Sequence, residues 1–263
     1  MNNIIGVEFV FPFMGNRNTV NSDERMLDIM EALKEHTSAG VTELADAVDM
    51  PKSTVHVHLS TLKDRGYVVQ NNSQEYRLSL QLLDMGMMVQ ETQEMYDEVL
   101  PKLDELAEET DEKAWWTVEE NGKAVFIAKS VGKHGIQTNA RIGHHIELYQ
   151  LAAGKAILAN LPAVRRTEIL DSYDYPLGGE KTRAELEAEL EEIRDRGVAY
   201  GSEQFLQGVS GVGASITDNA GNSYGAISVS GPSNRLDSDR VENELANLVR
   251  GLVGELRVNL SYR

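Results

Sequence analysis

The sequence predicts an α+β protein of two domains: an N-terminal, all-α-type winged helix-turn-helix, a linker helix and a C-terminal α/β domain. Three observations lead to this fold class. The 263 residues are enough for two domains of ordinary size. Residues 41–78 contain a pair of short amphipathic helices followed by a hairpin pattern. After Lys113, short strand-like segments alternate with helical ones.

The expected domain boundaries follow changes in composition along the chain. Residues 1–20 form either a disordered leader or part of a mis-assigned start, because their apolar patch lacks the basic segment of a signal peptide. Residues 21–80 form the winged helix-turn-helix, residues 81–98 the linker and dimerisation helix, and residues 99–263 the larger domain. The first helix is expected at residues 22–36, with Ser22 as its N-cap.

The segment most typical of a DNA-binding module is the helix that Pro51 introduces. Val55, Leu59 and Leu62 form one apolar stripe on this helix. The opposite face is short, polar and almost uncharged, so it would approach base edges and phosphates without steric conflict. An ordinary amphipathic helix with a Ser/Thr-rich surface is the alternative. The residues expected to contact DNA, including two cations for phosphates, are Lys52, Ser53, Thr54, His56, Val57, Ser60, Thr61 and Arg77.

The neighbouring segments favour the DNA-binding interpretation. A compact helix is expected at residues 41–48, one short turn before Pro51. Gly66 ends the second helix in the manner of a C-cap glycine. Residues 67–69 and 76–78 are strand-like and flank a turn, which together predict the hairpin of a wing.

The linker, residues 81–98, carries many leucine and methionine side chains and is expected to be helical. A core helix and a helix that packs against its twin in a dimer both fit this composition, since methionine suits adaptable contacts. Pro101 is expected to open the next helix, residues 101–109.

The larger domain has a mixed order of strands and helices. Strands are expected at residues 114–118, 124–130, 136–142, 198–200, 211–217 and 223–230, and helices at 151–161, 165–173, 182–196 and 236–260. Trp115 and Trp116 point in opposite directions on their strand, one into the core and the other towards a domain or subunit interface. Ser228 and Ser230 share one face of the last strand. Their hydroxyls need partners, either nearby backbone or the carboxylate or hydroxyl of a ligand.

Several stretches of the chain match motifs of one protein family. They are Lys52–Val55, Leu62–Val68, Tyr76–Ser79, Ala152–Ala159, Ile193–Ala199, Gly211–Ile216 and Ala226–Pro232. On these residues, and over about residues 22–260, the chain resembles IclR-type transcriptional regulators. The resemblance implies a GAF-like effector-binding domain, with a small ligand between the sheet and the helix that starts at Ala152. The effector site it implies, together with the strand pattern, consists of Ile146, Ala152, Ala153, Gly201, Gly211, Ser228 and Ser230.

The chain departs from the family pattern at positions that bear on specificity. Val57 stands where relatives usually carry an arginine on the recognition helix, and it would instead pack on a thymine methyl group. Gly201 and Gly211 stand where well-known relatives carry an acid and a cysteine, and Tyr149 where histidine is frequent. Neither the operator sequence nor the effector can therefore be copied from relatives.

The net charge of −17, from 42 acidic and 25 basic residues, is unusual for a DNA-binding protein. Either the chain does not bind DNA, or it works in concentrated salt, where the Debye length falls to about 3 Å at 1 M and repulsion is screened. The second interpretation predicts a halophilic, cytoplasmic protein, whose acidic surface maintains solubility. No apolar run reaches the length of a membrane span, so no membrane partner is expected.

Enzymatic chemistry finds little support in the sequence, and neither a catalytic residue nor a cofactor is expected. The absence of cysteine excludes disulfides, thiol nucleophiles and cysteine-based zinc sites. Gly154-Lys155-Ala156 lacks the upstream glycine and the following Ser/Thr of a phosphate loop. His144 and His145 are adjacent, point apart on a strand and make a poor pair of metal ligands, so no metal is expected.

The leading hypothesis is a ligand-responsive transcriptional regulator that binds a palindromic operator in double-stranded DNA as a homodimer or tetramer. A small-molecule effector, for which the resemblance suggests an organic or sugar-derived acid, would shift the population of dimer geometries. Repressor and activator roles both remain open. The alternatives are a small-molecule-binding enzyme with an N-terminal interaction module, and a winged-helix module that binds protein.

Overall fold

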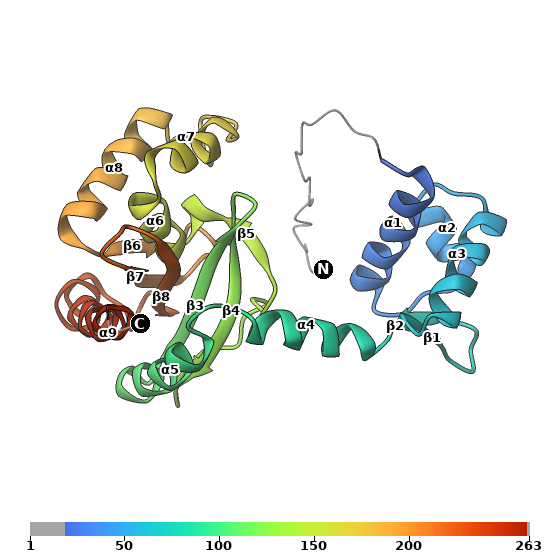
Figure 1. Cartoon of the computed structure of the whole chain (residues 1–263), viewed down its shortest axis with the longest axis horizontal. Helices are drawn as coiled ribbons and strands as arrows, with labels where there is room; N and C mark the ends of the chain where they lie inside the picture. The colour runs from blue at the N-terminus through green and yellow to red at the C-terminus, as the bar shows by residue number, and fades with distance from the viewer. Residues whose placement is uncertain (1–18, 262–263) are drawn as a thin grey trace. The chain divides into compact units, whose positions relative to one another are not determined.

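A computed structural model describes residues 19–261 of the chain (Figure 1). The predicted leader, residues 1–20, lies almost entirely outside the described residues. The chain divides into two compact units, with the boundary between Val89 and Gln90. Each unit has its own hydrophobic core, so each is described by itself.

The N-terminal unit consists of three helices and a two-stranded hairpin. Its elements are α1 (Asn21–His36), α2 (Val41–Ala47), α3 (Lys52–Asp64), β1 (Val68–Gln70) and β2 (Tyr76–Leu78). The apolar stripe of α3 is fully buried with Ile29 and Leu33 of α1 and Leu44 of α2. This order confirms the predicted winged helix-turn-helix.

Local hydrogen bonds form the turn of the wing and attach the hairpin to the helices. Asn71 shapes the wing turn: its amide donates to Glu75 Oε2 at 2.8 Å, and its carbonyl accepts from the Glu75 backbone N–H at 2.9 Å. The backbones of Ala39 and Tyr76 bond to each other and fasten the hairpin to the helices. One detail of the prediction was wrong. Val20, not Ser22, occupies the N-cap of α1, and the Ser22 hydroxyl bonds Asp23 instead.

The predicted linker region contains the helix α4 (Gln81–Glu91) and the start of α5 (Tyr96–Thr110). Met95 has a left-handed φ of 73° just before α5, which separates the two helices. Pro101 therefore lies inside α5 and does not open it, contrary to the prediction. Proline favours the first helical turn because it lacks a backbone N–H, but the sequence does not show how many residues precede it in that helix.

The C-terminal unit is built on one six-stranded antiparallel sheet. Its order is β5 (His145–Glu147), β4 (Lys123–Val131), β3 (Lys113–Glu120), β8 (Ser223–Pro232), β7 (Val209–Thr217) and β6 (Ala199–Ser202). The prediction of a strand at residues 136–142 was wrong. That segment is a loop, and the edge strand is β5, which pairs Ile146 with Ala124.

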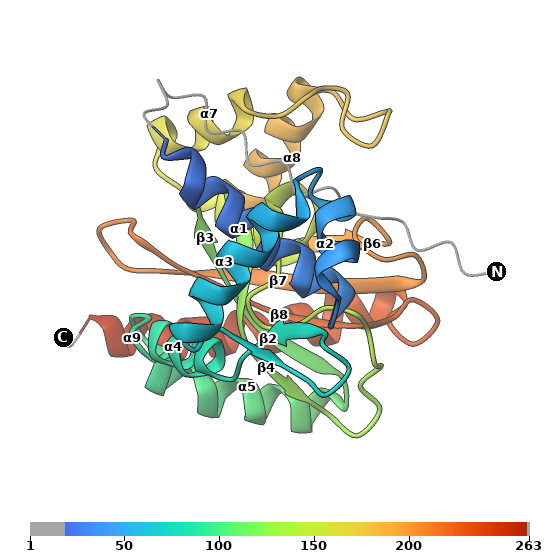
Figure 2. The same ribbon diagram turned by 90° about the vertical axis from the view of Figure 1, so that its right-hand side faces the viewer.

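Helices cover both faces of this sheet (Figure 2). One face packs on α5 and α9 (Ala246–Leu260), and the other on α6 (Ala152–Asn160), α7 (Ala163–Asp171) and α8 (Arg183–Arg196). The 3₁₀ helix η1 (Leu148–Gln150) precedes α6, and the π-helical segment η2 (Arg240–Leu245) precedes α9. Trp116 lies in the first of these cores and Trp115 on the opposite face, so both rings are buried within the unit.

Close backbone contacts fix the start of α6 over the sheet. A Cβ atom on Gly213 of β7 would lie 2.9 Å from the backbone nitrogen of Ala153, so only glycine allows this approach. Behind it, the buried Lys155 donates to Glu189 of α8 at 2.6 Å, and Lys181 bonds the same carboxylate. This arrangement leaves the first residues of α6 directly above β6 and β7.

Among residues 19–261, no helix has both the length and the hydrophobicity that a membrane crossing requires.

Candidate functional site

The outer face of α3 is the first candidate site, and nearly all of its predicted contact residues are exposed. Lys52, Ser53, His56, Val57, Ser60, Thr61 and Arg77 are exposed, and Thr54 is half-buried. Val57 leaves 63% of its surface in solvent. The face is therefore available to a macromolecular partner.

The charge of this face differs from that of the whole chain. No acidic residue occurs in α3 before its last residue, Asp64, although the net charge of the chain is −17. Among residues 19–261, the Arg77 guanidinium bonds only the adjacent carbonyl of Leu78, at 3.2 Å, and pairs with no carboxylate. The Thr61 hydroxyl donates to the Val57 carbonyl at 3.1 Å and retains its capacity as an acceptor. A phosphate backbone would meet little repulsion here.

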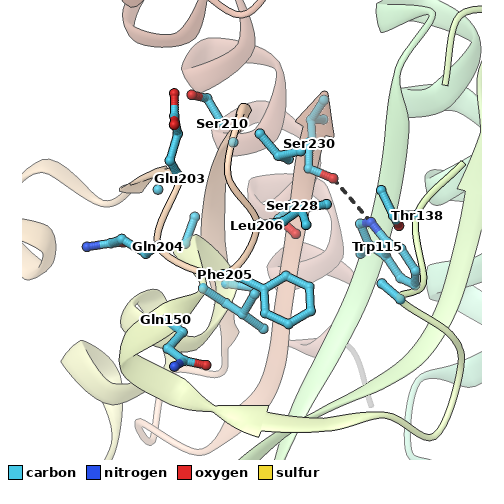
Figure 3. Close-up of a pocket in the computed structure, with 18 of the residues that line it drawn as sticks. Trp115, Thr138, Gln150, Glu203, Gln204, Phe205, Leu206, Ser210, Ser228 and Ser230 are labelled. Carbon is cyan, nitrogen blue, oxygen red and sulfur yellow. Dashed lines mark hydrogen bonds between the residues drawn. The ribbon is translucent and has the colours of Figure 1, made fainter. Parts of the chain in front are cut away.

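The second candidate site is a cavity between the sheet and the start of α6 (Figure 3), with about 620 Å³ of space when its opening to solvent is included. Strands β3, β4, β7 and β8, the loop after β6 and the start of α6 all contribute to its wall. Its lining residues include Trp115, Phe126, Thr138, Gln150, Phe205, Leu206, Ser210, Ser228 and Ser230.

Aromatic rings form much of the cavity wall. Trp115 and Phe126 are in contact, with ring centroids 4.3 Å apart and planes inclined by 31°. Phe205, from the loop after β6, meets Phe126 edge-on at 6.5 Å. Figure 3 shows the Phe205 ring in the middle of the site, across from Trp115. This lining would bind the flat apolar body of a small molecule.

The polar groups of the cavity differ in how far they are already satisfied. Trp115 Nε1 donates to Ser230 Oγ at 3.2 Å, and Ser210 Oγ lies 2.9 Å from Ser233 Oγ. The Ser228 residue is 7% exposed, and its hydroxyl, on the cavity side, forms no hydrogen bond among residues 19–261. Because Ser228 lines the cavity and its hydroxyl has no protein partner, that hydroxyl is available to a ligand atom.

The structure brings together nearly all of the predicted effector residues. Ala152, Ala153, Gly201, Gly211, Ser228 and Ser230 line the cavity. The exception is Ile146, which was expected there and is not among the lining residues. It packs in the cluster of Trp115 and Phe126, because it lies on the edge strand β5 and supports the wall from behind.

Gly201 and Gly211, the two glycines that depart from the family pattern, each lie close to a neighbouring backbone. A Cβ on Gly211 would lie 2.6 Å from the Val229 carbonyl oxygen of the neighbouring strand. A Cβ on Gly201 would come within 3.3 Å of the Ala152 backbone nitrogen. A side chain at Gly211 would require β7 to shift away from β8, and a side chain at Gly201 would require a small shift between β6 and α6.

Sequence reasoning missed much of the wall. Trp115 was expected either in the core or at an interface, and Phe126, Thr138 and Phe205 were not singled out. The signal for Trp115 was its pairing with Ser228 across β3 and β8, which requires knowledge of the strand order. Phe205 lies in a loop that has no periodic pattern.

No group of three or more potential metal ligands occurs among residues 19–261.

Comparison with known protein families decides the identity of the chain. The IclR helix-turn-helix domain matches residues 24–72, and the C-terminal domain of the bacterial transcriptional regulator IclR matches residues 87–256. The chain belongs to the IclR family of transcriptional regulators. This confirms the predicted family and fold class, and it argues against the enzyme alternative because the matched proteins are transcriptional regulators.

Relatives of this IclR-family chain match it over nearly its whole length. It is 27% identical to the probable HTH-type transcriptional regulator ArcR of Halobacterium salinarum, over 94% of this chain and 96% of that protein. The crystal structure of the Thermotoga maritima IclR has the same fold, with a TM-score of 0.75, 24% identity, and coverage of 91% of this chain and 98% of that one. An IclR homologue of Microbacterium hydrocarbonoxydans, complexed with 4-hydroxybenzoate, also shares the fold, with a TM-score of 0.75, 16% identity, and coverage of 92% and 100%.

Proposed function

We propose that this IclR-family regulator binds a palindromic operator as a homodimer and that a small metabolite in the C-terminal cavity changes its DNA affinity. The observation that carries this proposal is a cavity with aromatic walls, lined by the Ser228 hydroxyl, which forms no hydrogen bond among residues 19–261. The exposed outer face of α3 supplies the other half of the argument.

On the DNA side, α3 enters the major groove. Ser53, His56 and Ser60 reach base edges or phosphates, and Val57 packs on a thymine methyl group. Thr54 and Thr61 flank them on the same helix. Lys52 and Arg77 contact phosphates on either side of the groove. With few cations involved, the affinity depends less steeply on salt than that of a basic repressor.

On the ligand side, the effector lies between Trp115 and the start of α6. Ser228 and Ser230 bond its polar atoms, while Ala152 and Ala153 contribute backbone N–H groups of the first helical turn, which favour negative charge. The 4-hydroxybenzoate bound by the Microbacterium homologue supports a small acid as the ligand class.

A second copy of the chain supplies the dimer partner, and α4 is the proposed contact. Within the described chain, none of the α4 residues is buried. Leu80, Leu83 and Met87 follow an i, i+3, i+7 spacing, with Met88 beside them, and all four are exposed. Sedimentation equilibrium of Leu83→Glu plus Met87→Glu tests this contact. Monomers are expected, and an unchanged dimer would refute the role of α4.

We also propose that the protein works in concentrated salt, because screening reduces the repulsion between its net charge of −17 and DNA. A haloarchaeal relative supports this. The midpoint of thermal unfolding is expected to rise when KCl is increased from 0.1 M to 2 M. A high, salt-independent midpoint would contradict the proposal.

The operator proposal is tested by footprinting the purified protein in molar KCl on the DNA upstream of its own gene. Protection of two symmetric half-sites, separated by about one helical turn or a multiple of it, is the expected result. Absence of protection at every salt concentration would remove the DNA-binding function.

A further inference from the structure

A buried lysine lies beside the cavity without any acidic partner. Lys113, at the start of β3, exposes only 4% of its surface. Its Cα pairs with that of Ser230, and Trp115 pairs with Ser228, so Lys113 shares the sheet face on which the cavity opens. A charge this deeply buried normally has a counter-ion.

The contacts of Lys113 are weak for a buried ammonium group. Its Nζ donates to Thr138 Oγ1 at a long 3.4 Å and lies 5.4 Å from the centre of the Trp115 ring. Among residues 19–261 it forms no ion pair with a carboxylate. The neighbouring charge is another cation, Lys129, whose Nζ lies 5.7 Å from the same ring. Burial, together with the positive charge of Lys129, holds the pKa of Lys113 below its usual value.

Lys155 is the contrast within the same unit. It is equally buried, with 2% of its surface exposed, but its Nζ lies 2.6 Å from a Glu189 oxygen. Lys155 is thus a structural ion pair, complete without a ligand. Lys113 has a similarly small exposed fraction and no such partner among residues 19–261, although Thr138 and Trp115, which it contacts, both line the cavity.

Acidic residues nearby do not fill this role. Glu112, adjacent in the chain, has its carboxylate bonded twice by Arg235, at 2.8 Å in each case. Glu203 lines the cavity on the side opposite Thr138 and Trp115 (Figure 3). Thr138, Trp115 and Ser230 therefore line an end of the cavity that has Lys113 and Lys129 beside it and no carboxylate among its own lining residues.

We propose that Lys113 is the counter-charge for a carboxylate of the effector, bound at the end of the cavity formed by Thr138, Trp115 and Ser230. The effector class is then a small organic acid with a flat apolar body, which lies along Trp115 and Phe126 with its acid group towards Lys113. This inference rests on the proposed function of the cavity, and it adds the specificity-determining residue and the ligand charge. Ser228 bonds a second polar atom of the same ligand.

Matched pairs of acids and amides test the inference on the full-length protein. The probes are benzoate and benzamide, phenylacetate and phenylacetamide, and hexanoate and hexanamide, measured by calorimetric titration. At least one acid is expected to bind the wild type about ten-fold or more tightly than its amide. Lys113→Met keeps the volume, removes the charge, and is expected to abolish this preference while changing amide affinity less than about two-fold. Loss of a ten-fold preference for the acid corresponds to about 1.4 kcal/mol of binding free energy.

Two controls separate this role from a structural one. Lys133→Met removes the same charge from an exposed position and should leave both affinities unchanged. Without ligand, Lys113→Met is expected to unfold at the same temperature as the wild type or a higher one, because an unpaired buried charge is removed. A clear fall in that temperature would indicate a structural role and overturn the inference.

The remaining outcomes distinguish the inference from the function it rests on. An acid preference that persists in Lys113→Met, or binding of amides alone, overturns the role of Lys113 but leaves the cavity as an effector site. Binding of no acid in the set overturns the inference as well. If neither acids nor amides bind, and none changes operator affinity in a parallel DNA titration, the proposed function of the cavity also fails.

Discussion

The outer face of α3 and the C-terminal cavity differ in how they relate to the protein core. The α3 face is a run of nearly consecutive, exposed residues, backed by the stripe of Val55, Leu59 and Leu62. The cavity takes its walls from several strands, a loop and α6, and these walls include buried core residues such as Trp115, Phe126 and Ala153. Substitutions on α3 should therefore change binding without changing stability, whereas many substitutions around the cavity should change both.

The largest expected effect tests the α3 side of this comparison. Ser53→Glu combined with His56→Glu places two negative charges on the face opposite the apolar stripe. Operator affinity is expected to fall by roughly 100-fold or more, about 2.7 kcal/mol, because the charges would face phosphates. Gel-shift titration measures the loss, and circular dichroism should show an unchanged melt. Retained operator binding, or an unfolded N-terminal unit, would contradict the claim that the α3 face binds DNA without contributing to stability.

The next effect concerns the packing that holds the cavity in place. A Cβ on Gly154 would overlap the backbone of Leu148, so Gly154→Ala must displace α6 from η1. The expected loss of unfolding free energy is about 1–3 kcal/mol, as for other overpacked sites. Urea unfolding followed by tryptophan fluorescence measures it, since both tryptophans lie in the C-terminal unit.

A glycine in an open helical position provides the control for that prediction. Gly254 of α9 has no atom within 4 Å of a built Cβ. Gly254→Ala should therefore stabilise the unit slightly, by roughly 0.5–1 kcal/mol. An equal loss for both variants would show that packing against η1 is not the cause.

A smaller effect is expected from the cavity hydroxyls. Ser228→Ala combined with Ser230→Ala removes two hydroxyls and leaves the Trp115 N–H without its acceptor. The affinity for an effector found with the acid and amide probes should fall about ten-fold, or about 1.4 kcal/mol. Operator affinity without effector should stay unchanged. A fall in operator affinity alone would place these serines in DNA binding rather than ligand binding.

The smallest effect is at a capping box remote from the cavity. Thr182 caps α8: its hydroxyl accepts from the Glu185 backbone N–H, and the Glu185 carboxylate accepts from the Thr182 N–H at 2.8 Å. Thr182→Ala is expected to lower the unfolding free energy by about 1 kcal/mol. Calorimetric titration should find effector affinity intact. A loss of ligand binding here would mean that stability and the cavity cannot be separated even at a distance.

The same contrast explains what the sequence could predict. The periodicity of α3 identifies its buried stripe, and the opposite face follows from geometry, so local pattern was sufficient for Ser53, His56 and Val57. The shared face of Ser228 and Ser230 could be predicted for the same reason, because side chains alternate between the two faces of a strand whichever strands lie next to it.

The remainder of the cavity depends on contacts between distant segments. Trp115 faces it only because β3 pairs with β8, and Phe205 reaches it from a loop. The missed edge strand has a similar origin. The segment 136–142 is rich enough in apolar residues to resemble a strand, but the backbone of β4 pairs with His145–Glu147 instead. Lys113 gave no local signal, because its lack of a counter-ion is a property of the packed unit.

The central claim is that ligand binding and DNA binding occupy separate units of one regulator. Fluorescence anisotropy of a labelled operator fragment, with and without a cavity ligand, tests it most directly on the wild type and the Ser228→Ala plus Ser230→Ala variant. We predict that the ligand shifts the operator affinity of the wild type, and that the variant binds the operator equally well but loses the shift. An operator affinity that no cavity ligand changes, in either protein, would contradict the account.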